Sequence, residues 1–99
     1  MSINPNWMRG RREYRWEDGG YIYVFRLDRQ SASFEEIDSL DFSRYLLEID
    51  VQGLMMALHI TDLGRLAEEV KAHFSYGIME HFLKEHGISY STYSEAYFD

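Results

Sequence analysis

Residues 11–29 read RREYRWEDGGYIYVFRLDR and contain the strongest local folding signal in the chain. Two runs suited to β-strands, 11–17 and 21–29, flank Asp18-Gly19-Gly20, whose glycines supply the positive φ values that a tight hairpin turn requires. The second run is apolar on both faces near its middle. We therefore expect a β-hairpin whose second strand is covered on both faces or lies centrally in a sheet; one face carries Tyr21, Tyr23, Phe25 and Leu27, and the other carries Ile22, Val24, Arg26 and Asp28.

The segment after this hairpin matches the start of a helix. In Ser33-Phe34-Glu35-Glu36 the serine hydroxyl is placed to cap an amide three residues on, while Glu36 reaches back toward the serine. This capping box predicts a short helix that ends near Leu40.

The spacing of apolar residues in 41–61 is compatible with both a strand and a helix. Leu47, Ile49 and Val51 alternate as in a strand, but apolar residues from Leu47 to Leu58 also recur at helical spacing. We predict strands over 41–51 and 54–61, because Gln52-Gly53 suits a two-residue turn and a glycine inside a helix costs about 1 kcal/mol. The helical interpretation of 41–60 stays open.

Helical spacing dominates the next part of the chain. Apolar residues recur every three or four positions between Thr61 and His86, which predicts one long amphipathic helix capped by Thr61 and ended by Gly87. Gly77 indicates a kink, a close approach to a strand, or a break into two helices. The tail, 88–99, is rich in tyrosine and fits either an edge strand or a short helix.

Together these patterns predict one α+β domain over residues 1–99. We expect an antiparallel sheet of two β-hairpins, a short helix between them, and a long amphipathic C-terminal helix packed on one face. Residues 1–10 are expected to form a loosely ordered lead-in.

The composition excludes several classes of protein. The chain has no cysteine, which rules out disulfide scaffolds, thiolate zinc sites and thiol nucleophiles and favours a reducing, cytoplasmic location. The longest apolar stretch, 54–58, is too short to cross a bilayer, and 1–12 has no apolar core of signal-peptide length. We therefore expect a soluble protein with no membrane partner.

Motifs that carry chemistry are missing from the sequence. It has no G-x-S-x-G, no H-E-x-x-H and no glycine-rich phosphate loop. Glu69 with His73, and His81 with Glu85, are each four residues apart, but neither pair supplies the three or four donors that a metal requires. We predict no enzymatic activity, no cofactor and no metal site; the alternative is a small ligand-binding domain or enzyme with a pocket lined by His59, His73 or His81.

Charge is unevenly distributed along the chain. Ten basic and seventeen acidic side chains give a net charge of −7. Residues 1–29 contain six basic and four acidic residues (+2), whereas residues 30–99 contain four and thirteen (−9). The run 7–16 interleaves arginine with aromatics, a mixture suited to nucleic acid, but the acidic excess opposes direct binding to a polyanion.

Acidic residues and eight tyrosines favour a protein partner with a basic surface. We expect a non-enzymatic interaction module, specifically an inhibitor that occupies the nucleic-acid-binding surface of a partner such as a nuclease. Phage inhibitors of defence nucleases, including anti-CRISPR proteins, and toxin immunity proteins act in this way, an analogy of class and not of motif. The alternative is a homo-oligomerising assembly module, possible as a homodimer through a sheet edge or helix face. The candidate contact residues are Glu35, Glu36, Asp38, Asp41, Glu68, Glu69, Tyr93, Tyr97, Phe98 and Asp99.

Overall fold

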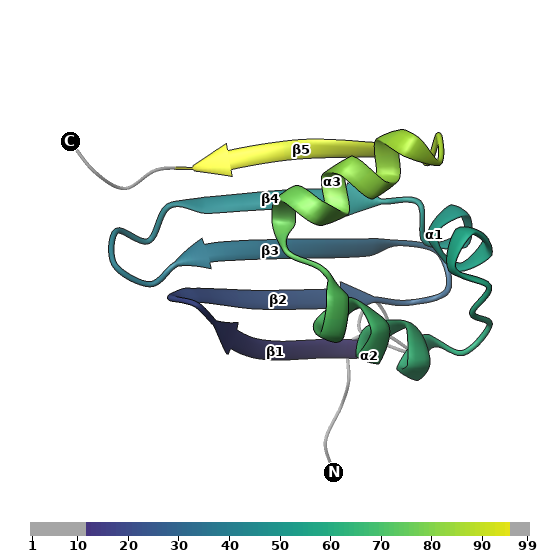
Figure 1. Cartoon of the computed structure of the whole chain (residues 1–99), viewed down its shortest axis with the longest axis horizontal. Coiled ribbons are helices and arrows are strands. Elements are labelled where there is room, and N and C mark those ends of the chain that lie inside the picture. Colours follow the sequence, from purple (N-terminus) through teal and green to yellow (C-terminus); the bar gives the residue numbers. More distant parts are fainter. Residues whose placement is uncertain (1–11, 96–99) are drawn as a thin grey trace, which may run out of the picture.

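The computed structural model describes residues 12–95, which form one five-stranded antiparallel sheet and three helices (Figure 1). The strands lie side by side in the order of the chain. Three helices separate the fourth strand from the fifth, and α2 and α3 lie over one face of the sheet while α1 lies near one of its ends. The elements are β1 (Arg12–Asp18), β2 (Tyr21–Leu27), β3 (Ala32–Asp38), β4 (Arg44–Ile49), α1 (Val51–Leu58), α2 (Leu63–His73), α3 (Tyr76–Glu85) and β5 (Tyr90–Glu95).

The structure forms the first hairpin as predicted. Asp18 lies opposite Tyr21, and Gly19 and Gly20 between them have φ values of 59° and 86°. Because β2 lies between β1 and β3, both of its backbone edges are paired with neighbouring strands. Val24 in its middle is also buried.

The prediction of a short helix from Ser33 to Leu40 is wrong, because β3 occupies this segment. A two-residue turn after β2 returns the chain beside it: the Asp28 amide donates to the Ser31 carbonyl at 2.9 Å, and the Asp28 carboxylate accepts from the Gln30 and Ser31 amides. In that register Ala32 and Phe34 enter the core at strand spacing. Pairing with β2 thus overrides the local capping signal.

The predicted second hairpin over 41–61 is also wrong, since only β4 is a strand and α1 follows it. Gly53 lies inside α1 and not in a turn. A Cβ atom there would meet Ile88 at 3.1 Å, so the glycine allows the segment before β5 to pack closely on the helix. Val51 and Leu54 are buried in the core on the same helix.

The predicted long helix from Thr61 to His86 is two helices. Asp62, and not Thr61, caps α2 by accepting from the Arg65 amide at 2.9 Å. The chain becomes extended at Phe74, and Ser75 caps α3. The break turns α3 over β3 and β4, where Met79 and Leu83 are buried.

The tail forms the edge-strand alternative. Gly87 ends the helical region with a φ of 65°, and β5 then pairs antiparallel with β4.

The class of the fold is α+β, but the expected arrangement is wrong: residues 12–95 contain no long C-terminal helix and no helix between two hairpins. The helices and one sheet face enclose a core that includes Phe25, Phe34, Leu47, Leu54, Leu66, Met79 and Leu83.

Candidate functional site

One face of the sheet carries no described helix, and its side chains are the alternate residues that do not enter the core. Cross-strand pairing places Arg15, Val24, Glu35 and Leu46 in one row across this face. Glu35 is only 2% exposed there. A carboxylate that is removed from water needs charged or hydrogen-bonding partners.

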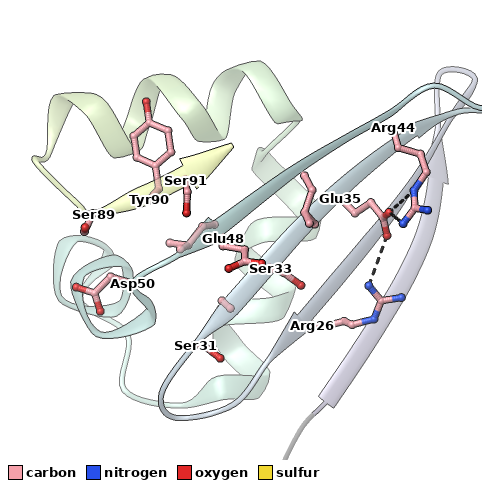
Figure 2. Close-up of a pocket in the computed structure, with 13 residues that line it drawn as sticks. Arg26, Ser31, Ser33, Glu35, Arg44, Glu48, Asp50, Ser89, Tyr90 and Ser91 are labelled. Atoms are coloured by element: carbon pink, nitrogen blue, oxygen red, sulfur yellow. Dashed lines mark hydrogen bonds and ion pairs between the residues drawn. The ribbon is translucent and has the colours of Figure 1, made fainter. Parts of the chain in front are cut away.

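Arginines from two neighbouring strands supply these partners (Figure 2). The Arg44 guanidinium binds one carboxylate oxygen of Glu35 through Nε, at 2.6 Å, and through Nη2. Arg26 Nη1 lies 3.5 Å from the other oxygen. Two arginines therefore neutralise Glu35 and cover it from solvent.

The ion pairs continue to the edge of the sheet. Arg26 also binds Glu13 at 2.8 Å, and Glu13 binds Arg15 at 2.8 Å. Hydrogen bonds from Arg15 and then from Arg26 hold the pKa of Glu13 below its usual range. The arrangement links β1 to β4 with alternating charges.

A shallow depression of about 500 Å³ lies on this face beside the buried ion pair (Figure 2). Serine hydroxyls and charged side chains line it, including Ser33, Glu48 and Ser91. Arg26 is paired with both Glu13 and Glu35, and Arg44 is paired with Glu35. Among residues 12–95, no three histidine, aspartate or glutamate side chains converge on a possible metal position. The contacts observed at this end of the depression are ion pairs within the fold.

Glu36 follows Glu35 in the chain but projects to the helix-covered face. Its carboxylate accepts the Tyr76 amide at 3.2 Å, at the start of α3. Burial, together with the hydrogen bond to Glu36, raises the pKa of the Tyr23 phenol above its ordinary value. Glu36 thus joins the sheet to α3.

A different part of the fold exposes apolar side chains, at the end of the sheet where the β1–β2 turn and the β3–β4 loop meet (Figure 1). The Ser39 amide and hydroxyl both donate to the Gly20 carbonyl, at 3.0 and 2.7 Å. Asp38 Oδ1 accepts the Leu40 amide at 2.8 Å, and Asp41 Oδ1 accepts the Ser43 amide and hydroxyl at 2.9 and 2.7 Å. Hydrogen bonds within the loop and to the β1–β2 turn thus constrain its conformation.

This ordered loop presents two large apolar residues to solvent. Leu40 is 91% exposed and Phe42 is 59% exposed. Phe42 also has a φ of 60°, a left-handed conformation that favours glycine and is an outlier for a bulky residue. We call this region the loop-end surface and define it as Asp18, Tyr21, Asp38, Leu40, Asp41 and Phe42.

The loop-end surface also carries three carboxylates. Asp18 and Asp41 are exposed, and Asp38 is half-buried in the turn. Hydrogen bonds from the amide and then from the hydroxyl of Ser43 lower the pKa of Asp41. The surface therefore combines exposed hydrophobic side chains with acidic groups.

The structure disperses most of the contact residues predicted from the sequence. It brings together Asp38 and Asp41, on the loop-end surface. Glu68 and Glu69 lie on α2, where Glu69 is 3.7 Å from His73, and Tyr93 lies on β5 at 53% exposure. Tyr97, Phe98 and Asp99 lie outside the described residues, as does the arginine and aromatic run before Arg12.

Leu40 and Phe42 were not among the predicted contacts. The signal for them was an apolar-acidic alternation, Leu40-Asp41-Phe42, beyond the expected helix end. His59, His73 and His81, which would line the alternative ligand pocket, lie on three separate helical elements: the C-cap of α1, α2 and α3. Within the described chain they form no cluster of three donors that could hold a metal ion.

Comparisons of the chain with protein-family models, with curated proteins and with solved structures find no match. No helix within residues 12–95 is long and apolar enough to span a membrane.

Proposed function

We propose that the chain is a non-enzymatic protein-interaction module that inserts its loop-end surface into a partner. Phe42 is the observation that supports this proposal. Its left-handed backbone costs about 1–2 kcal/mol relative to glycine, and 59% of the residue is exposed to solvent. A large apolar residue that is both exposed and held in an unfavourable backbone conformation is expected where binding requires it.

Leu40 gives the same surface a second apolar contact. A few large side chains that enter pockets supply most of the binding energy at protein interfaces. The hydrogen bonds of Asp38, Ser39 and Asp41 already order the loop, so binding loses little conformational entropy. These properties favour Leu40 and Phe42 as the anchors of the interface.

The charge of the loop-end surface favours a partner whose apolar pocket is bordered by basic side chains. Asp18 and Asp41 are exposed on the same surface as the two anchors, and hydrogen bonds from Ser43 lower the pKa of Asp41. Nucleic-acid-binding surfaces are basic because they bind phosphates. We infer that the partner is a nucleic-acid-handling protein, such as a nuclease, and that the chain inhibits it by occupying this surface.

The test compares partner capture by matched variants. Leu40→Ser and Phe42→Gly remove one anchor each. Met56→Ser removes an apolar side chain of intermediate exposure (75%) from α1, near the opposite end of the sheet. Extract of the cells in which the chain is naturally made is passed over each bait, and captured proteins are quantified by mass spectrometry. We expect one protein to be retained by the wild type and Met56→Ser but lost with both loop variants.

Calorimetry on the purified partner then measures affinity. Loss of either anchor is expected to weaken binding at least about tenfold, and the complex is expected to exclude nucleic acid from the partner. Phe42→Gly should fold as stably as the wild type or up to about 1 kcal/mol more stably in urea unfolding. Equal capture by all four baits, or a partner that still binds nucleic acid in the complex, would contradict the proposal.

A further inference from the structure

β5 is an edge strand, and its outer side has no neighbouring strand among the described residues. The Asp50 amide donates to the Ser89 carbonyl at 3.0 Å, and the β4–β5 register continues from that pair. In an antiparallel ladder, residues alternate between those that bond to the neighbouring strand and those that point away. The backbone groups of Ser91 and Tyr93 therefore face β4, whereas those of Tyr90, Thr92 and Ser94 face outward.

Before its last residue, Glu95, this edge has none of the features that usually block strand addition. Residues 90–94 read YSTYS, with no lysine, no proline and no charged side chain. The other edge strand, β1, reads REYRWED and is protected by alternating charges. Exposed edges without such protection pair readily with another strand.

The edge is also complementary to itself. Outward-facing residues must form the hydrogen-bonded pairs of a new antiparallel ladder. A two-fold axis at Thr92 satisfies this rule, because it places Thr92 opposite Thr92 and Tyr90 opposite Ser94 of the second copy. On the helix-free face the exposed Tyr93 then lies beside Ser91 of the second copy. Threonine pairs are favourable across strands, and no like charges meet within this segment.

We propose that two copies of the chain associate through antiparallel pairing of their β5 strands, which joins the two sheets into one. The interface is isologous, because the same strand is used by both copies. It leaves the loop-end surface free, since that surface lies on the β1–β2 turn and the β3–β4 loop. The inference is thus independent of the proposed partner.

Sedimentation velocity over a concentration series up to the millimolar range tests this pairing. Thr92→Pro removes an amide that points outward, a position where an edge strand tolerates proline, and so it should keep the fold but abolish the dimer. Thr92→Ala keeps the amide and should keep the dimer. Circular dichroism of both variants should match the wild type. A wild type that stays monomeric throughout, or a Thr92→Pro variant that dimerises as the wild type does, overturns the proposal.

Hydrogen exchange gives a second readout at single residues. The amides of Thr92 and Ser94 should become protected as the wild-type concentration rises, while those of Ser91 and Tyr93 stay protected at every concentration. Each copy carries a net charge of −7, so added salt should tighten the dimer by screening repulsion. Thr92 and Ser94 amides that exchange rapidly at every concentration contradict the pairing. Phe42→Gly should dimerise normally, which separates this test from that of the proposed function.

Discussion

Glu35 and Glu36 are adjacent in the chain but project to opposite faces of β3. Glu35 is buried beneath Arg26 and Arg44, and Glu36 accepts a hydrogen bond from the start of α3. Both were expected to be partner contacts. The strand that replaces the predicted helix separates them, because successive strand residues point in opposite directions.

Removing an arginine partner of Glu35 should lower the stability of the fold more than neutralising Glu35 itself. Arg26 and Arg44 are partly exposed and can be solvated without their partner, whereas Glu35 cannot. We expect Arg44→Ala to lower the free energy of unfolding by roughly 2–3 kcal/mol, because it leaves a buried carboxylate with only one distant cation. Glu35→Gln should cost about 1 kcal/mol.

Urea unfolding of both variants measures the difference. Arg15→Ala is the control, because Arg15 lies on the same face but binds the exposed Glu13, so its loss should change stability by less than about 0.5 kcal/mol. A cost for Glu35→Gln that equals or exceeds that of Arg44→Ala would refute this account.

Helix α1 shows how an element can form against its local preference. Gly53 and the strand-like spacing before it favour a turn, yet Val51 and Leu54 are buried at helical spacing. Ile88, which directly precedes β5, occupies the space beside Gly53. Contact with a distant segment thus stabilises a helix in which glycine is intrinsically unfavourable.

Two glycine substitutions should therefore have opposite effects on stability. In Gly53→Ala the new Cβ would meet Asp50 and Ile88 at 3.1 Å, so we expect no gain, or a loss, in thermal stability. In Gly77→Ala of α3 the new Cβ meets nothing within 4 Å, so we expect a gain of about 0.5–1 kcal/mol.

Differential scanning calorimetry compares the two midpoints. Gains of equal size at both glycines would show that packing against Ile88 does not constrain α1.

At the scale of the whole molecule, the sheet mixes charges that are separated along the chain. The sequence suggests an arginine-rich beginning and an acidic remainder. Pairing of β2 with β3 instead brings Arg26 to Glu35, and Glu13 and Arg15 bind each other within β1. The loop-end surface carries acidic groups together with the exposed apolar residues Leu40 and Phe42.

Association with the proposed partner should therefore weaken as salt rises from low to physiological concentration. Asp18→Asn should slow association and reduce this salt dependence, because it removes an exposed charge beside the anchors. Glu68→Gln on α2 should have no effect. Stopped-flow binding to the purified partner measures the association rate of each variant at each salt concentration. Association that does not depend on salt, or a larger effect of Glu68→Gln than of Asp18→Asn, would argue against the loop-end surface.

By itself, the sequence determined the first hairpin, the α+β class and the end of the helical region at Gly87. These depend on local signals: glycines with positive φ and alternation along one strand. Tertiary structure decided β3, α1, the break at Phe74 and the choice of strand for β5. Each of these segments has two acceptable local conformations, and contacts with β2, Ile88, the core and β4 select between them. The same is true of the candidate site, because the exposure of Leu40 and the backbone of Phe42 depend on a loop that exists only once β3 and β4 are paired.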